Sequence, residues 1–498
     1  MPNAYPRWAT RKQKRISWVL SQAPAPHAGR HVDVQSRGFV FMLKPVSRLI
    51  LAASAAVPLV VGAYTPEDHL AWLKANQSAQ PQFVEGDVIT YDKADLIRPF
   101  IPEEQQDELI FEGMQMTIKD AGDLSPADVY KTATEKFAGQ TNLASDGALE
   151  NYTAGRPFDP ATFTPGSKED GWRLIWNFMR RWQNDGLRNE EVHWVWVRRG
   201  GDHNKHEVMS KDGGKYAEYY TGGGSFERVL AGPYQRVIMS GRSDLPETNY
   251  RMNNGEGFAK NTFFREYTGF NSPFDIAGTA FLILRYDDPR KADDSWAYIP
   301  SLRRVRRISV EVKSDSLLGT DHTLEDFYGF NGRPMEHDWE YIGSANLLAV
   351  ARSRTTDTIY YGPSGWAPLD DWSLREVDVL RMYPNRDTHP YSTKFIYIDR
   401  ESGEAFYANA FDKAGELWKI WQIQKSWTED PHYAAQQDKF DGDVTPAGTR
   451  VVAFQSINVI DLQNDRGTLV PCRGQSYPDT DIQKVKRTHD VNYLTEGR

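Results

Sequence analysis

The spacing of hydrophobic and polar residues changes character about a third of the way along the chain. In residues 65–68 a threonine N-cap, a proline and two acids precede apolar residues at helical spacing. Residues 125–128 repeat this arrangement with a serine cap. The pattern therefore predicts helices that begin near these two caps, with a short strand between them over residues 82–91.

From about residue 171 onward the pattern becomes typical of strands. Residues 192–198 alternate so that Val192, Trp194 and Trp196 share one face while valines occupy the other. A strand that is apolar on both faces meets the core on one side and a cavity or a cover on the other. Further strand-like runs lie at residues 228–239, 279–286, 296–299, 305–312, 339–341, 395–399, 405–411, 417–424 and 449–462.

Turns rich in glycine and aspartate separate several of these runs, as at residues 399–403 and 412–415. Short strands with hairpin spacing predict an antiparallel sheet that bends or partly closes. Strands do not alternate regularly with helices, which argues against a doubly wound fold or a TIM barrel. The expected fold class is α+β, mainly antiparallel β. We expect one large domain over residues 64–498, whose first part, about 64–140, is helical.

The chain opens with a segment unlike the rest. Residues 1–41 contain seven basic residues and one acid and show no helical or strand period, so we expect a disordered upstream extension. After Met42 come a short basic stretch and an apolar run of 13 residues at 49–61. This layout predicts a secretory signal peptide over residues 42–63, cut after Ala63. The run is shorter than the ~20 residues of a membrane span.

Composition narrows the possible functions. The whole chain of 498 residues carries 59 basic and 68 acidic side chains. Residues 1–63 hold nine of the bases and one acid, so removing them lowers the net charge from −9 to −17. Such an acidic protein is a poor candidate for nucleic-acid binding. Cys472 is the single cysteine, which excludes intramolecular disulfides and cysteine-based metal clusters.

The sequence contains no motif that indicates catalysis. A phosphate-binding glycine loop, a nucleophile elbow and a His-Glu-x-x-His zinc motif are all missing from the sequence. Paired carboxylates are too common in an acidic protein to identify a glycosidase. We therefore expect no enzymatic activity, no catalytic residue, no metal site and no cofactor.

The most informative segment covers residues 277–330. Four arginines stand close together: Arg303, Arg304, Arg306 and Arg307. The acids that follow are Asp315, Asp321, Glu325 and Asp326. Arginines on both faces of one strand are costly to bury unpaired, which favours an ion-pair network with these acids at the rim of the sheet. The alternative is a basic patch at a cavity mouth or docking surface, suited to anionic headgroups or an acidic partner.

Apolar side chains of the same strands are the candidates for lining a ligand cavity or its rim. They are Trp194, Trp196, Trp296, Tyr298, Phe281 and Ile283. Tryptophans in strands are more often core residues than ligand contacts, so packing within the core is the competing interpretation.

Residues 293–326 carry a long pattern: Asp-Asp-x-Trp-x-Tyr-x-Pro, then x-x-Arg-Arg-Val-Arg-Arg, then Ser-Asp-Ser-x-x-Gly-Thr-Asp, then Glu-Asp-Phe. It resembles a domain-of-unknown-function family of exported Gram-negative proteins related to outer-membrane lipoprotein-sorting factors. The resemblance extends over most of the chain after residue 63 and does not cover residues 1–41. The sequence departs from the family pattern at His322, where an aromatic residue is expected.

The resemblance implies a LolA-like architecture, a strongly curved and incompletely closed antiparallel barrel whose concave apolar face is covered by helices. It implies a periplasmic carrier or chaperone for a lipid or another hydrophobic ligand, with possible association with the outer membrane. An RND-type (MMPL-like) transporter and an outer-membrane protein are the implied partners, and no enzymatic activity is implied.

Two other functions stay open from the residues themselves. One is a cell-envelope glycan-binding protein or hydrolase that uses tryptophans as stacking platforms. The other is an adaptor that binds no ligand and contacts a transporter through the arginine patch.

Overall fold

The structure, a computed structural model, describes residues 64–200, 214–309, 314–355, 357–433, 450–476 and 481–496. The expected upstream extension, signal peptide and cut after Ala63 lie outside the described residues.

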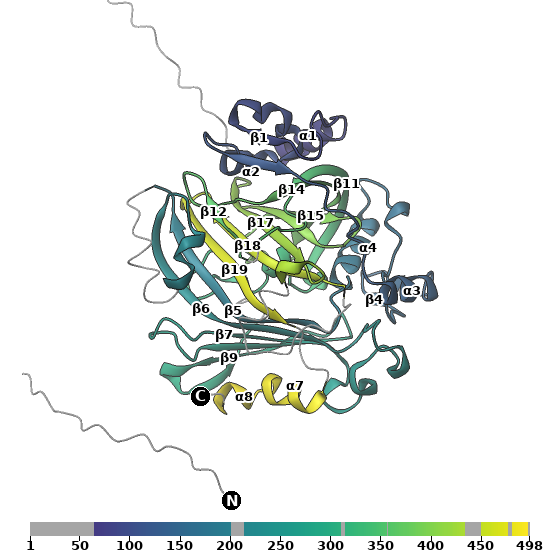
Figure 1. The fold of residues 1–498 in the computed structure, drawn as a ribbon. Coiled ribbons are helices and arrows are strands. Elements are labelled where there is room, and N and C mark those ends of the chain that lie inside the picture. The colour runs from purple at the N-terminus through teal and green to yellow at the C-terminus, as the bar shows by residue number, and fades with distance from the viewer. Residues whose placement is uncertain are drawn as a thin grey trace, which may run out of the picture. The chain divides into compact units, whose positions relative to one another are not determined.

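Most of the described strands join one 15-stranded sheet (Figure 1). Its strands are β1 (Val88–Thr90), β2 (Gln115–Ile118), β5 (Gly186–Arg198), β6 (Ser225–Ile238), β7 (Thr262–Gly269), β8 (Ala280–Tyr286), β9 (Asp294–Ile299), β10 (Arg304–Arg307), β11 (His337–Ala349), β14 (Asp371–Pro384), β15 (Thr393–Asp399), β16 (Ala405–Phe411), β17 (Leu417–Trp427), β18 (Val452–Asp461) and β19 (Arg466–Ser476). Two short hairpins stand apart: β3 (Asn142–Leu143) with β4 (Leu149–Glu150), and β12 (Tyr360–Tyr361) with β13 (Ala367–Pro368).

The strand order is β1-β2-β14-β15-β16-β17-β18-β19-β5-β6-β7-β8-β9-β10, and β11 pairs with β14 on the side away from β15. All neighbours are antiparallel except β2 and β14, which are parallel. The first and last strands of this order do not pair with each other in the described part, so the sheet is open. The prediction of a mainly antiparallel, incompletely closed sheet is confirmed.

The sheet bends so that strands far apart in the order share one core. Figure 1 shows β14–β18 above β7–β9. A single cluster of buried residues combines Leu380 of β14, Trp194 of β5 and Ile283 of β8. We call the side of the sheet that faces this cluster the inner face. Strand β5 shows the predicted double burial, because Val192 and Trp194 belong to the inner cluster while Val195 and Val197 pack on the outer face.

Helix α4 (Lys168–Met179) covers part of the inner face and packs against β11 and β14. The side chain of Ser167 caps it by accepting a hydrogen bond from the backbone N–H of Asp170 at 3.1 Å. Its buried side is amphipathic and includes Leu174, Ile175 and Phe178. The prediction that a helix covers the apolar inner face is therefore confirmed for α4.

Helices near both ends of the described part of the chain lie on the outer face. An N-terminal layer with α1 (Pro66–Asn76) and α2 (Glu103–Leu109) packs on β11 and β14–β17, and α3 (Asp128–Lys136) follows. The predicted cap at Thr65 is present as a capping box with Asp68. At the other end of the chain, α7 (Ile482–His489) and α8 (Tyr493–Glu496) cover the outer face of β7–β9 (Figure 1). Among the described helices, none has the length and apolar character that a membrane span needs.

Candidate ligand-binding site

The inner face is filled by residues 320–334, which we call the inner segment; all of them are buried. Its acids are paired with bases from separate strands of the sheet. Asp321 accepts hydrogen bonds from Arg466 of β19 at 2.6 Å and from the Thr468 hydroxyl at 2.9 Å. Asp326 pairs with Lys394 of β15 at 2.5 Å and accepts a hydrogen bond from the Tyr391 hydroxyl at 2.8 Å. The inner segment is thus fixed to distant strands by charge.

Glu325 lies between two buried histidines. Nε2 of His337 lies 2.8 Å from one carboxylate oxygen, and Nε2 of His389 lies 3.0 Å from the other. A carboxylate and two imidazoles could bind a metal ion. However, Nδ1 of His389 lies 3.1 Å from the Tyr391 backbone N–H, which can only donate, so Nε2 must carry the proton and donate to Glu325. The geometry therefore favours a hydrogen-bonded carboxylate over a metal site.

The far end of the inner segment contacts β6–β8. The side-chain amide of Asn331 contacts Arg236 and Glu266, which form a buried ion pair. Arg285 of β8 donates to the backbone oxygens of Asn331 at 3.0 Å and Gly332 at 2.8 Å. Tyr328 adopts a left-handed backbone conformation with φ of 62°, which is rare for a bulky residue. That strain is maintained by the packing around the segment.

The pKa values of the two acids follow from these partners. Burial alone disfavours the charged form of Asp326, yet the ammonium groups of Lys394 and Lys419 outweigh it and hold the pKa below its ordinary value. Burial acts the same way on Glu325, and hydrogen bonds from His337 and His389 lower its pKa well below the usual range. Both acids are therefore fixed in the charged state.

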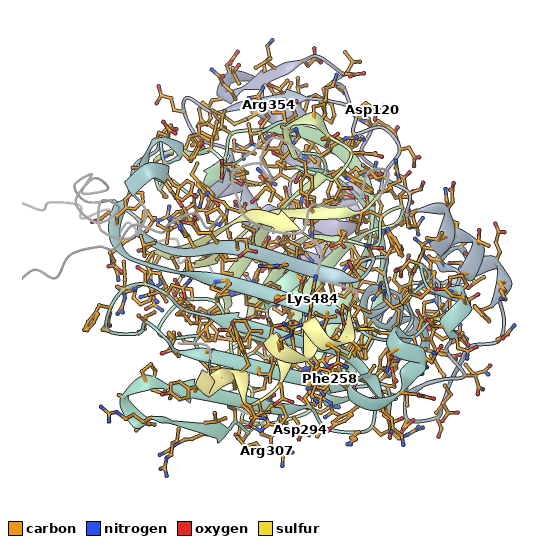
Figure 2. The ribbon with its side chains drawn as sticks, turned by 60° about the horizontal axis from the view of Figure 1, so that its bottom comes forward. Asp120, Phe258, Asp294, Arg307, Arg354 and Lys484 are labelled. Atoms are coloured by element: carbon orange, nitrogen blue, oxygen red, sulfur yellow. The ribbon has the colours of Figure 1, made fainter. Side chains whose placement is uncertain are left out.

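The arginine run does not pair with these acids, contrary to the expected network. Asp321, Glu325 and Asp326 turn into the core, where Arg466, two histidines and Lys394 bind them, while Asp315 is exposed. The four arginines remain at the surface on and beside β10: Arg303, Arg304, Arg306 and Arg307. Arg307 pairs with Asp294 of β9, and Figure 2 shows these two labelled side chains close together.

The six candidate cavity residues divide between the two faces of the sheet. Trp194 and Ile283 belong to the inner cluster, and Phe281 packs against it. Tyr298 and Trp296 contact the outer cluster that includes Leu494 of α8. Trp196 is half-buried, with the Arg466 guanidinium 4.9 Å from its ring centre. The structure brings Trp194, Phe281 and Ile283 together as packed core and leaves the others apart from them.

A cavity of about 380 Å³ lies on the outer face, between β5–β7 and the two C-terminal helices. Its sheet side is formed by Arg188, Glu190, Pro233, Tyr234, Gln235 and Tyr267. Its helical side is formed by Lys484, Val485, Arg487, Thr488 and Tyr493. Figure 2 shows α7 and α8 lying across the strands, with Lys484 labelled on α7.

The cavity combines rings with positive charge. The rings of Tyr267 and Tyr493 meet edge to face with centres 5.6 Å apart. Arg188 and Glu190 form an ion pair at 2.5 Å, and burial raises the pKa of the Glu190 carboxyl. Lys484 and Arg487 add two more positive charges at the helical side. The arrangement suits a ligand with an apolar body and an anionic group.

The sequence interpretation missed this cavity. Its two sides come from strands near residues 188–267 and from helices after residue 481, so no local pattern joins them. The available signal was the cluster of bases Lys484, Lys486 and Arg487 close to the C-terminal end.

The fold and the cavity define a protein built on one open, mainly antiparallel sheet with a cavity under its C-terminal helices. Residues 113–496 match the family model described as "Protein of unknown function (DUF1329)", and the chain belongs to this family. The expected membership in a domain-of-unknown-function family is confirmed.

Among curated proteins, the chain is 22% identical over 311 residues to the uncharacterized protein PA3922 of Pseudomonas aeruginosa. The match covers 59% of this chain and 58% of that protein, so the chain spans less than two thirds of the relative's length.

Several solved structures are similar at low identity. A putative outer membrane lipoprotein-sorting protein domain from Vibrio parahaemolyticus is 14% identical, with 66% of this chain and all of that chain covered and a TM-score of 0.41. A DUF1329 family protein from Desulfovibrio piger is 15% identical, with the same coverage and TM-score. The LolA superfamily protein NE2245 from Nitrosomonas europaea is 12% identical, with 64% and 94% covered and a TM-score of 0.33.

Proposed function

We propose that this protein is a periplasmic carrier that binds a lipid with an anionic headgroup in the cavity beneath α7 and α8. The observation that carries the proposal is the cavity itself, whose volume of about 380 Å³ falls in the usual range of ligand pockets. It is lined by tyrosines and by three basic residues, and so offers both apolar surface and charge.

The inner face is the less suitable place for a ligand. A ligand there would have to displace the inner segment, and so separate Asp326 from Lys394 inside the core and Asp321 from the partly buried Arg466. Breaking one buried ion pair costs about 3–5 kcal/mol. Burying an acyl chain yields about 0.8 kcal/mol per methylene. Breaking the ion pairs would therefore offset much of the free energy gained by burying the acyl chain.

In the outer cavity both parts of an amphiphile have partners without such rearrangement. An acyl chain can pack on Tyr267, Val485 and Tyr493, while Arg487 and Lys484 lie at the helical side for a carboxylate or phosphate. Binding without catalysis is part of the proposal, and no cofactor is needed.

The proposal includes the cellular setting expected from the sequence. The signal-peptide pattern before residue 64 supports export to the periplasm. Transfer of the ligand would involve an RND-type transporter and an outer-membrane partner, and the resemblance noted from residues 293–326 supports both.

Two exposed residues of α7 give a matched test. Arg487 lines the cavity whereas Lys486, its neighbour on the same helix, does not. Arg487→Glu should weaken uptake of a fluorescent fatty acid about tenfold, equal to about 1.4 kcal/mol, while Lys486→Glu should change it less than about twofold.

Native mass spectrometry of protein purified from the periplasm gives an independent readout. A lipid should remain bound to the wild type and be depleted in Arg487→Glu. The absence of both lipid and fatty-acid uptake in the wild type, or equal losses in the two variants, would contradict a carrier that uses this cavity.

A further inference from the structure

Strand β10 ends the strand order and pairs with β9 alone among the described strands. The N–H of Ile308 donates to the oxygen of Ser295 at 2.8 Å, which identifies this facing pair as hydrogen-bonded. Bonded and non-bonded pairs alternate in an antiparallel ladder. The backbone N–H and C=O groups of Arg304 and Arg306 therefore bond to β9. Those of Val305 and Arg307 point away from the sheet.

The side chains at this edge are strongly basic. Arg304 and Arg306 face Ile299 and Ala297 of β9, so both project from the same face of the sheet. They and Arg303 are exposed and form no ion pair within the described residues. Val305, on the other face, packs beside Tyr298 under α8.

The connection before the strand adds apolar surface. Ile299 and Leu302, at the turn between β9 and β10, are 37% and 44% exposed. The edge thus offers, within a few residues, free backbone donors and acceptors, two exposed aliphatic side chains and a row of arginines.

We propose that β10 is a docking edge for an acidic, extended peptide segment of a partner protein, which adds to the sheet as one more strand. The backbone of Val305 and Arg307 would supply the ladder bonds. Acids of the incoming strand would lie opposite Arg304 and Arg306, where cross-strand pairs of opposite charge are favourable.

The charges also select against other occupants. Exposed edge strands commonly carry charge so that copies of the same protein do not pair, and the arginines supply that charge on β10. An acidic strand is the occupant that such an edge accepts instead of repelling. An anionic lipid surface would also attract the arginines, but it cannot form ladder hydrogen bonds with the outward backbone groups of Val305 and Arg307.

The test uses a fluorescent synthetic peptide of about ten residues that alternates aspartate with valine. The wild-type protein should bind it, and binding should weaken as salt rises. A peptide of the same charge with proline in place of the valines should bind at least ~10-fold more weakly, because proline cannot donate to the ladder.

Two pairs of variants separate backbone from charge. Val305→Pro removes an outward N–H and should reduce peptide binding ~10-fold relative to Val305→Ala, which loses similar packing. The double variant Arg304→Glu/Arg306→Glu should abolish binding, whereas Lys486→Glu should retain it. Circular dichroism and fatty-acid uptake should match the wild type for Arg304→Glu/Arg306→Glu.

Equal binding of the two peptides, or of Val305→Pro and Val305→Ala, would overturn the proposal. So would binding only to phosphatidylglycerol vesicles, which would assign the arginines to a membrane surface. The result is independent of the carrier function, because peptide binding without fatty-acid uptake would keep the docking edge and reject the carrier.

Discussion

The arginine run and the inner segment are close in sequence and opposite in environment. Arg304 and Arg306 are exposed on a terminal strand, whereas Asp321, Glu325 and Asp326 are buried and bound to bases from β11, β15 and β19 and the loop before β15. The arginines and the acids are close in sequence, which suggested one ion-pair network. In the fold the acids are paired inside the core and the arginines lie separately at the surface.

The difference shows what each group of charges does. A buried acid with a dedicated base fixes the position of the segment and leaves no room for a ligand. An exposed base that forms no ion pair within the described residues can still accept a partner. The following predictions test this contrast, beginning with the largest expected effect.

Removing a buried acid should have the largest effect. Asp326→Ala leaves the ammonium group of Lys394 buried without its carboxylate, so the free energy of unfolding should fall by about 3–5 kcal/mol. Urea unfolding measures this. Arg306→Ala, at the exposed edge, is the control and should change stability by less than about 0.5 kcal/mol. Equal losses of unfolding free energy in the two variants would show that the exposed arginine contributes as much to stability as the buried acid.

Removing both members of the pair should recover most of the loss. Asp326→Leu with Lys394→Met replaces two buried charges by apolar side chains of similar size, and such replacements are often neutral or stabilising by about 1–4 kcal/mol. Thermal unfolding of the double variant should therefore resemble the wild type. A double variant as unstable as Asp326→Ala would show that the charges themselves hold the segment.

Acid should weaken the inner segment selectively. The pKa of Asp326 is below its ordinary value in the folded protein, so its stabilising contribution is complete above the unfolded pKa of about 3.9 and is lost as pH falls through the lower folded value. Stability measured by urea unfolding between pH 5 and pH 2, in steps of about 0.5, should decline less steeply in the Asp326→Leu/Lys394→Met variant. Identical slopes would assign the acid sensitivity to other carboxylates.

The smallest effect should come from the paired arginine of the edge. Arg307 forms its ion pair with Asp294 while its side chain is 71% exposed, so solvent screens most of the attraction. Arg307→Ala should lower the free energy of unfolding by no more than about 1 kcal/mol. A loss near that of Asp326→Ala would mean that the edge is structurally as important as the core.

The sequence predicted the strands whose pattern is apolar, and missed those whose charges are paired across the sheet. Strands β8, β9 and β15–β17 all follow apolar runs. Strand β14 was missed because Arg375 and Asp378 interrupt its pattern; they pair with Asp399 and Arg400 of the neighbouring strand and turn. Strand β19 was missed because Gly467 and Pro471 resemble a turn.

The candidate site was less predictable than the fold. The pattern around Trp194 fits either a core residue or a ligand contact, because a packed face and an empty cavity have the same apolar alternation. The cavity beneath α7 depends on contacts between Tyr267 and residues after 481. Only tertiary structure brings such distant positions together.

The position of β19 in the sheet has a consequence for how the protein folds. Next to β5, this strand places Arg473 beside His193, which lies 280 residues earlier. The two halves of the sheet can therefore join only after β19 has been synthesised. Folding that depends on such distant contacts is slow. A chain that cannot pair β5 with β19 early stays unfolded longer, which would suit the export that we propose from the signal-peptide pattern.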